Sequence, residues 1–432
     1  MKNRIYIEII FLFILGSLSS LSLPPFNLFL INFFTFSLFF LFLIKKSKKL
    51  VNLKFYFFYG WLFGFGYFIT NLYWISISLS FDQKLKFLIP LVVLAIPAFI
   101  ALFYGIISYL FLTFRPKQIL SSVLFFSLIF GSIEFVRGLI LTGFPWNLIV
   151  YSFSNQLEIL SIISIIGTYG FNLFCITLFT CPIIFILKEN KRDLAFPILI
   201  IFLTIIFYFY GTSYKSRFYQ VEKKINDLKI RVIASNISLN RFYKSVDSVS
   251  VIEDLIKISD PKPNEKIIFV WPEGILPDIS QKELKEYDWI FNQSFNENHL
   301  LIMGINSHIT ENGYRSSYNS LSIYDNKLNL LNSYNKINLV PFGEFLPLEN
   351  LLKNFGLKTI TNNYQSFSKG DQRDIIEIKH HNKLLKILPL ICYEIIYTGK
   401  LFKNSSYDFI INISEDGWFG KSIGPKQHFD HS

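Results

Sequence analysis

The residue best suited to chemistry in this sequence is Cys392, which follows an apolar run from Leu384 to Ile391. Such a run predicts a buried strand, and α/β sheets present reactive groups just beyond the carboxyl ends of their strands. The other two cysteines, Cys175 and Cys181, lie in an apolar stretch, where a thiol is most simply a small hydrophobic side chain. Cys392 is therefore either a buried core thiol or a nucleophile, and the residues that accompany it decide between the two.

Two other strand ends carry residues that would complete a site for acyl transfer. Glu273 follows the expected strand Lys266–Trp271, and Lys336 follows the expected strand Leu328–Tyr334. A carboxylate can take the thiol proton so that sulfur attacks an acyl carbonyl, and an ammonium group can stabilise the resulting oxyanion. Taken singly, Glu273 fits a carboxylate that begins a helix, and Lys336 fits a solvated lysine. The three residues form no local motif, so their spacing alone does not bring them together.

The elements that must position these residues occupy only half of the chain. Of the 432 residues, 18% are aromatic and 17% are charged. Residues 1–213 consist of apolar runs with sparse charge, whereas residues 214–432 have the mixed composition of a water-soluble domain. We therefore expect a transmembrane domain over 1–213 and a catalytic domain over 214–432.

The charge and cysteine content exclude several other classes of protein. The net charge of +11 lies largely in short loops between apolar runs, where it sets membrane orientation. No block of Lys and Arg with interleaved aromatic residues resembles a nucleic-acid groove. Three cysteines give no disulfide framework, and the scattered histidines lack the spacing of metal ligands, so neither a metal nor a cofactor is implied.

The first half contains seven apolar runs, most of which reach the roughly 20 residues needed to cross a bilayer. They are Ile5–Leu23, Phe26–Ile44, Phe55–Leu79, Phe87–Phe114, Ile119–Ile140, Leu157–Leu187 and Leu194–Tyr210. Basic residues gather before the first run and after the second, fourth and sixth, which places the amino terminus in the cytoplasm by the positive-inside rule. Because seven spans put the two ends of this half on opposite sides, residues from 214 onward are expected outside the cytoplasm.

One membrane loop contains residues that could contact a substrate. Glu134 and Arg137 close the fifth run and are followed by the segment 142–146, which ends on Trp146. The two charged side chains either reach the interface by snorkelling or form a polar site for a lipid headgroup or substrate. Trp146, like Trp61 and Trp74, is expected in an interfacial aromatic belt.

The second half alternates strands with helices. Strands are expected at Leu228–Ser235, Lys266–Trp271, Leu300–Ser307, Tyr318–Tyr324, Leu328–Tyr334, Asp374–Lys379, Leu384–Ile391 and Tyr407–Ile413, and helices at Tyr243–Ser259 and Gln281–Asn298. Short turns at Asp325-Asn326 and His381-Asn382 predict two hairpins. Alternation combined with hairpins predicts a layered α/β domain with a mixed sheet.

Four segments of the second half together resemble the nitrilase superfamily. They are Trp271-Pro272-Glu273, Lys336 with the run 339–344, Cys392-Tyr393-Glu394, and the run 416–420 with Gln427-His428. Seven spans ahead of such a domain, with Gly143-Phe144-Pro145-Trp146 between spans five and six, resemble the membrane branch of that superfamily, the bacterial apolipoprotein N-acyltransferases. The resemblance implies a multi-pass α-helical membrane domain in the inner membrane, followed by an α/β nitrilase-like αββα sandwich domain in the periplasm.

The resemblance also implies roles for particular residues. Glu273 would be the general base, Lys336 the oxyanion-stabilising residue, Cys392 the nucleophile, Glu344 a support for the lysine, and Tyr393 and Glu394 residues that shape the site. Glu134, Arg137, Trp146 and Phe242 are expected to bind substrate or lipid. The implied reaction transfers an acyl chain from a membrane phospholipid, through a Cys392 thioester, to the N-terminal amine of diacylglyceryl-cysteine on an apolipoprotein. We expect a monomer that needs no cofactor.

The sequence departs from the family pattern at three places. The segment from Asn236 to Tyr243 lacks the usual glutamine and tryptophan, and Phe242 or Tyr243 is the nearest aromatic residue. Glu415 replaces the asparagine that usually precedes Asp416. The chain stops at Ser432, so we expect a C-terminally incomplete domain without its last strands and final span, and with reduced activity.

Two other functions remain open on the sequence alone. A membrane-tethered amidase or nitrilase would use the same three residues and pass the acyl group to water, although one membrane anchor would then suffice. A transporter with a regulatory domain would be expected to carry more intramembrane charges than the first half has.

Overall fold

The computed structural model describes residues 2–48, 52–220, 227–243, 247–311, 313–347, 366–399 and 406–432, together with Glu349 and Thr359. The chain divides into two compact units, Met1–Glu222 with Phe419–Ser432, and Lys223–Trp418. The boundary expected at residues 213 and 214 lies inside the last long helix, which runs on to Gln220. The sequence assigned residues 419–432 to the second domain, whereas they group with the helices.

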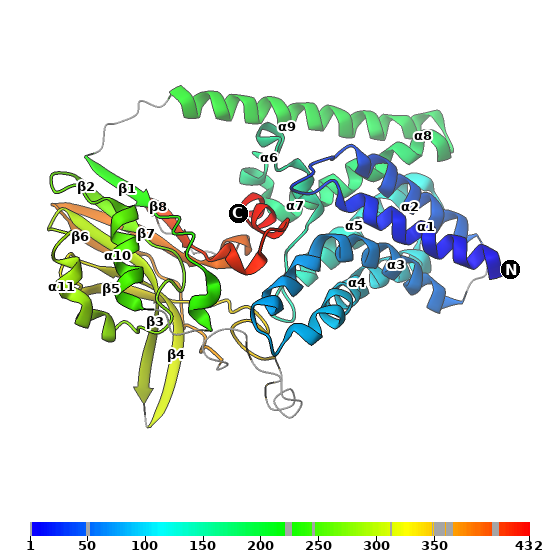
Figure 1. Ribbon diagram of the computed structural model, residues 1–432. Coiled ribbons are helices and arrows are strands. Elements are labelled where there is room, and N and C mark those ends of the chain that lie inside the picture. Colours follow the sequence, from blue (N-terminus) through cyan, green and yellow to red (C-terminus); the bar gives the residue numbers. More distant parts are fainter. Residues whose placement is uncertain are drawn as a thin grey trace. The chain divides into compact units, whose positions relative to one another are not determined.

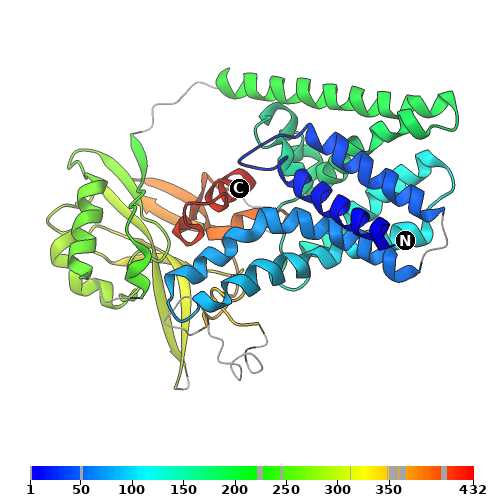
Figure 2. The same ribbon diagram turned by 45° about the vertical axis from the view of Figure 1, so that its right-hand side comes forward.

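The first unit is built from helices (Figures 1 and 2). In chain order they are α1 (Lys2–Ser20), α2 (Ile31–Ser47), α3 (Leu53–Leu72), η1 (Tyr73–Phe81), η2 (Lys86–Leu88), α4 (Ile89–Phe114), α5 (Ile119–Arg137), η3 (Ile149–Phe153), α6 (Leu157–Leu160), α7 (Ile163–Thr180), η4 (Cys181–Ile183), α8 (Ile184–Leu187), η5 (Lys191–Leu194), α9 (Ala195–Gln220) and α13 (Gly424–His431). The run expected as one span at Leu157–Leu187 is broken into shorter helices, and Gly167, with φ of 72°, interrupts the helical backbone inside α7.

Five helices among the described residues are long and apolar enough to cross a membrane, against seven expected spans. They are Leu53–Phe81, Lys86–Phe114, Ile119–Arg137, Ile163–Leu187 and Lys191–Gln220. The other two expected spans correspond to α1, whose apolar part Ile5–Ser20 is shorter, and to α2, which has 17 residues. Both fall below the roughly 20 residues that match the hydrocarbon core.

Close helix contacts in this unit depend on small residues. A Cβ atom on Gly16 of α1 would lie 1.9 Å from the carbonyl oxygen of Phe63, and one on Gly66 of α3 would lie 2.1 Å from that of Phe13. Helices that pack in lipid use small residues to bring their backbones together in this way. Stacked aromatic side chains such as Phe39 and Phe63, with ring centroids 4.2 Å apart, fill the interior.

The second unit holds two mixed sheets. The first has the order β1-β2-β3-β4-β5 and the second the order β6-β7-β8. The strands are β1 (Leu228–Val232), β2 (Lys266–Val270), β3 (His299–Glu311), β4 (Tyr314–Tyr324), β5 (Leu330–Asn335), β6 (Ile376–His380), β7 (Lys383–Ile391) and β8 (Phe409–Ile413). Strands β1, β2 and β3 pair in parallel, as do β7 and β8, while the other pairs are antiparallel. Both expected hairpins are confirmed, as β4–β5 and β6–β7.

Residues alternate between the two faces of the first sheet. Ile267 and Phe269 of β2 pack into a core with α10 (Ser248–Ser259) and α11 (Asp288–Phe291), which lie on one side of the sheet (Figure 1). The second sheet lies against the first, because β4 contacts β7 and β5 contacts β6. The layered α/β domain expected from the sequence is therefore present.

Of the two helices predicted in this unit, one is present and the other is not. Helix α10 begins at Ser248, where the Asp247 side chain accepts a hydrogen bond from the Val249 N–H and caps the helix. The prediction of one helix over Gln281–Asn298 was wrong. Two short helices form in this range instead, η7 (Glu283–Tyr287) and α11. The last residues of the range bond locally: the Asn296 side chain accepts from Asn298 N–H, an alternative to helical pairing.

Candidate active site

Residues from two distant strand ends meet at a buried lysine in the sheet unit. Lys336 follows β5, and its Nζ lies 3.1 Å from Oε1 of Glu273, just after β2, and 2.9 Å from Oε1 of Glu344. The Lys336 side chain is 1% exposed. Burial opposes its charged form, but the carboxylates of Glu273 and Glu344 outweigh burial and raise the Lys336 pKa well above its usual range. Lys336 is therefore a buried cation held between two carboxylates.

A fourth member of this cluster, Asn319 of β4, escaped the sequence analysis. Its Nδ2 donates to Oε1 of Glu273 at 2.7 Å and to Oε1 of Glu344 at 2.6 Å. It lies on the same strand face as the buried Leu321 and Ile323. A buried amide at a core-facing position needs partners, so this alternation was the signal that could have identified Asn319.

The carboxylates of Glu273 and Glu344 share one lysine and one amide, and this crowding affects the pKa of Glu344. Burial first, and then the charge of Glu273, raise the pKa of Glu344 above its ordinary value, although Lys336 pulls it down. The Glu344 side chain is also anchored through Oε2, which accepts from Val340 N–H at 2.8 Å.

Glu273 itself is fixed by the backbone around it. Its second oxygen, Oε2, accepts from the N–H of Glu415 at 3.2 Å, just after β8. The neighbouring strand β3 comes close because residue 304 is glycine: a Cβ there would lie 2.4 Å from Cα of Glu273. The carboxylate thus has one oxygen toward Lys336 and Asn319 and the other toward the turn that follows β8.

Cys392 occupies a sharp turn at the end of β7. Its φ is 56°, in the left-handed region that a non-glycine residue seldom adopts, and it begins the short helix η10 (Cys392–Ile396). Burial first, and then the charge of Glu273, raise the pKa of the Cys392 thiol well above its ordinary value, with Lys336 opposing them. The resting thiol is therefore protonated at neutral pH, and a nucleophilic thiolate requires transfer of its proton to a base.

Glu394 holds the cysteine turn against the segment after Lys336. It is fully buried, and its oxygens accept from Ile391 N–H at 3.0 Å and from Ile337 N–H at 2.9 Å. They also accept from the Tyr334 hydroxyl at 2.9 Å and pair with Arg373 at 2.8 Å. Arg373 is a second residue that the sequence did not indicate. The network locks the end of β7 to the end of β5.

Tyr393 and Phe242 flank the cluster. The Tyr393 hydroxyl donates to the Leu339 carbonyl at 2.8 Å, and its ring centroid lies 5.8 Å from Nζ of Lys336. The Phe242 ring lies against Gly274, the residue after Glu273, and its centroid is 4.9 Å from that of Trp418. Aromatic side chains therefore border Glu273.

The remaining predicted site residues belong to the helical unit and form a network of their own. Arg137 pairs with Glu134 at 3.1 Å and donates to the Trp146 carbonyl at 2.9 Å. Glu134 also accepts from the hydroxyl of Tyr104 at 3.1 Å and from Asn172 at 3.3 Å. Both charged side chains are about as buried as the core, with Glu134 0% and Arg137 1% exposed, so the snorkelling interpretation was wrong.

The interfacial-belt prediction was also wrong for two tryptophans. Trp74 and Trp146 are 4% and 2% exposed, and each indole N–H donates to Oε1 of Gln427 at 3.1 Å. Gln427 of α13 in turn donates to Oδ1 of Asn71 at 3.0 Å. This shared acceptor explains why residues 419–432 group with the helices.

Among the described residues, no group of three or more His, Cys, Asp and Glu side chains has an arrangement that could hold a metal ion. The lysine cluster and the cysteine turn beside it present a thiol, two carboxylates and a buried cation.

Comparison with known proteins matches both halves of the chain. Residues 15–181 match the apolipoprotein N-acyltransferase N-terminal domain, and residues 262–431, which include Glu273, Lys336 and Cys392, match the carbon–nitrogen hydrolase family. The membrane helical domain followed by a nitrilase-like domain is therefore confirmed.

Relatives named apolipoprotein N-acyltransferase align along nearly the whole chain. The relative from Brucella melitensis is 29% identical over 96% of this chain and 80% of its own length. Those from Rhodopseudomonas palustris and Rickettsia prowazekii are 30% and 32% identical, each over 96% of this chain, and cover 79% and 81% of the relatives. At this identity and coverage, the chain belongs to the apolipoprotein N-acyltransferase family.

Proposed function

We propose that this protein transfers an acyl chain from a membrane phospholipid to the N-terminal amine of diacylglyceryl-cysteine on apolipoproteins. The observation that carries the proposal is the cluster in which a buried lysine joins the carboxylate of Glu273 beside the strand-end thiol of Cys392. Apolar helices long enough to cross a membrane support lipid substrates.

In the first step, Glu273 takes the proton of the Cys392 thiol, and the sulfur attacks the ester carbonyl of the phospholipid. Among the described residues, two of the three N–H donors of Lys336 are engaged by Glu273 and Glu344, which leaves one for the oxyanion that forms on the acyl oxygen. The carbon–oxygen ester bond then breaks, the lysophospholipid oxygen takes the proton from Glu273, and the acyl chain remains as a thioester on Cys392.

In the second step, the α-amino nitrogen of the apolipoprotein attacks the thioester carbonyl. Glu273 accepts a proton from that nitrogen, the carbon–sulfur bond breaks, and the proton passes to the Cys392 sulfur as the amide is released. We assign Glu344 to holding Lys336, Glu394 and Tyr393 to fixing the cysteine turn, and Phe242 to contact with the acyl chain. For Glu134, Arg137 and Trp146, the internal contacts favour a role in holding the 138–147 loop over direct contact with a headgroup.

The test is mass spectrometry of the full chain after incubation with phospholipid vesicles. We expect a hydroxylamine-sensitive acyl group on Cys392, which a peptide beginning with diacylglyceryl-cysteine discharges into an amide and which water discharges slowly. The control, Cys392→Ser, should carry no acyl group at this position, because a hydroxyl has a higher pKa and resists activation. An acyl group on Cys175 or Cys181 would refute the site, and rapid hydrolysis without transfer to the amine would favour the amidase alternative.

We also propose that the sheet unit faces the periplasm, from the basic residues that follow alternate apolar runs. A reporter active only after export, fused after residue 222 where the units divide, should be active. The same reporter fused after Lys188, in a basic loop of the helical unit, should be inactive. The opposite pair of results would remove the periplasmic assignment and, with it, access to apolipoproteins.

A further inference from the structure

A buried arginine joins three loops around the base. Arg241 lies in η6 (Leu239–Phe242) and is 2% exposed. Its guanidinium donates to the carbonyls of Ile237 at 2.9 Å and Gly274 at 3.4 Å, and it pairs with the carboxylate of Glu415. These contacts come from the loops after β1, β2 and β8, and Gly274 directly follows Glu273.

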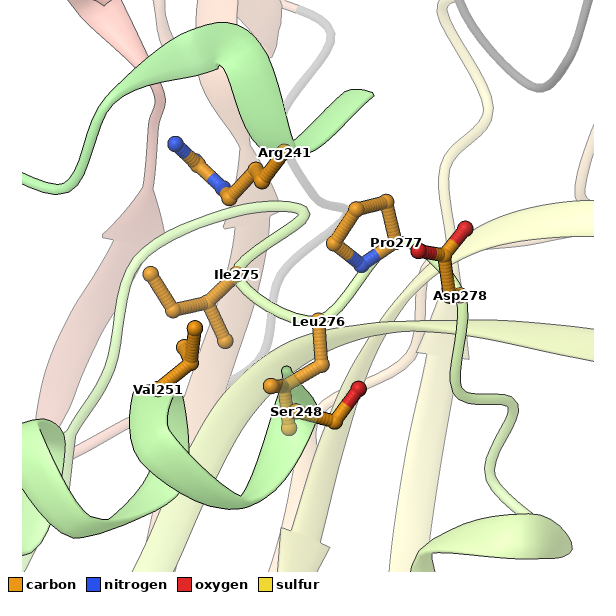
Figure 3. Close-up of a pocket in the computed structure, with 7 residues that line it drawn as sticks. All are labelled: Arg241, Ser248, Val251, Ile275, Leu276, Pro277 and Asp278. Atoms are coloured by element: carbon orange, nitrogen blue, oxygen red, sulfur yellow. The ribbon is translucent and has the colours of Figure 1, made fainter. Parts of the chain in front are cut away.

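Glu415 is the counter-charge for this arginine. The hollow beneath Arg241 is lined mainly by the apolar side chains of Val251, Ile275 and Leu276 (Figure 3). A guanidinium removed from water over an apolar surface needs a partner, and Arg241 forms its ion pair with the carboxylate of Glu415. The carboxylate is occupied on its other side too, because Oε1 of Glu415 accepts from Gly417 N–H at 3.0 Å.

The Glu415 side chain therefore fixes the turn that carries its own backbone N–H. That N–H donates to Oε2 of Glu273 at 3.2 Å, the oxygen that faces away from Lys336 and Asn319, which both contact Oε1. Because Oε1 already accepts from those two donors and Oε2 accepts only from the Glu415 N–H among the described residues, Oε2 has the more available lone pair for the thiol proton.

We propose that Arg241 and Glu415 are a positioning pair that aims Oε2 of Glu273 for proton transfer. Their side chains bond to each other and to loop backbone atoms, and it is the Glu415 N–H that touches the Glu273 carboxylate. They act by holding the turn after β8 against the loop after β2, so that the Glu415 N–H fixes the direction of the carboxylate. The inference rests on the proposed acyl transfer and adds to it the residues that orient the base.

The experiment is a single-turnover measurement of acyl-enzyme formation by the full chain at several phospholipid concentrations. Arg241→Met and Glu415→Gln should each slow the rate constant at saturating phospholipid on the order of 10- to 100-fold, the effect of a small misplacement of a reacting group. The concentration of phospholipid at half-saturation should stay unchanged. The double variant should be no slower than the slower single variant, because both changes release the same turn.

The amplitude of the reaction separates positioning from folding. A variant that folds poorly loses amplitude, the fraction of molecules eventually acylated, whereas a misdirected base lowers the rate constant of the molecules that do react. Arg241→Lys provides a folded alternative: it keeps the charge opposite Glu415 but cannot reach all the carbonyls, so its rate constant should lie between those of the wild type and Arg241→Met. Lys229→Met, which removes an exposed ion pair with Glu265, should react like the wild type.

Three outcomes would overturn the proposal: a wild-type rate constant in either single variant, a loss confined to amplitude or half-saturation, or single effects that multiply in the double variant. The wild type and Cys392→Ser are measured alongside. If the wild type forms no thioester, the proposed acyl transfer fails. If it forms one and the Arg241 and Glu415 variants match it, only the positioning inference fails.

Discussion

Replacing Lys336 by methionine should lower the rate of acyl-enzyme formation on the order of 100- to 1000-fold, the usual cost of losing an oxyanion donor. The physical reason is that Nζ is already fixed by Glu273 and Glu344, 3.1 and 2.9 Å away, so it needs no reorganisation when charge develops on the acyl oxygen. Methionine preserves much of the length of the side chain but offers no donor. The rate is measured by rapid quench and mass spectrometry of the thioester on Cys392.

The same substitution should also destabilise the sheet unit. Removing one partner of a buried ion pair typically costs about 3–5 kcal/mol, and here it leaves two carboxylates that share the Asn319 amide without the lysine charge. Adding Glu344→Gln to Lys336→Met relieves this repulsion, so the double variant should recover thermal stability while remaining slow. Lys386→Met, which breaks an exposed pair with Glu377, is the matched control. Near-normal thioester formation by Lys336→Met would show that the lysine is only structural.

Replacing Glu273 by glutamine should change two reactions of Cys392 in opposite directions. Acyl-enzyme formation should fall on the order of 100- to 10,000-fold, since a general base typically contributes that much. Alkylation by iodoacetamide should become faster at a given pH. Burial and then the Glu273 charge hold the pKa of the thiol well above its ordinary value, while Lys336 lowers it. Removing that negative charge lowers the thiol pKa and raises the thiolate fraction.

The pH dependence of alkylation follows from the direction in which the Cys392 pKa is shifted. In the wild type, the thiolate fraction is small at neutral pH and grows as the pH rises toward the raised pKa of Cys392, so alkylation should accelerate into the alkaline range. In Glu273→Gln that acceleration should begin at lower pH. Peptide mapping distinguishes Cys392 from Cys175 and Cys181, which are 0% and 2% exposed in the helical unit.

Glu265→Gln, which alters a carboxylate outside the cluster, serves as the matched control and should leave both reactions unchanged. If both reactions slow together in Glu273→Gln, the variant is misfolded. If acylation continues at the wild-type rate, Glu273 is not the base. The divergence of the two rates is the result that separates a catalytic carboxylate from one that only neighbours the thiol.

Local patterns determined much of this protein from the sequence alone. The change in composition near residue 213 separated apolar helices from a mixed α/β domain because burial in lipid and burial in a sheet core demand different periodicities. The alternation and turns around Asp325-Asn326 and His381-Asn382 defined both hairpins. The types of residue at three strand ends, Glu273, Lys336 and Cys392, indicated thioester chemistry, and the resemblance to a known family supplied the reason to group them.

Only the tertiary structure decided which side chains meet, because the contacts join residues far apart in the chain. Asn319 reaches Glu273 across 46 positions, and the Glu415 N–H reaches it across 142. The periodicity of the sequence indicates which face of a helix or strand is buried. The order of the strands and the close approach at Gly304 determine which residues meet on that buried face. For the same reason, Trp74 and Trp146, read locally as interfacial, are buried against Gln427, an acceptor that only the folded chain places between them.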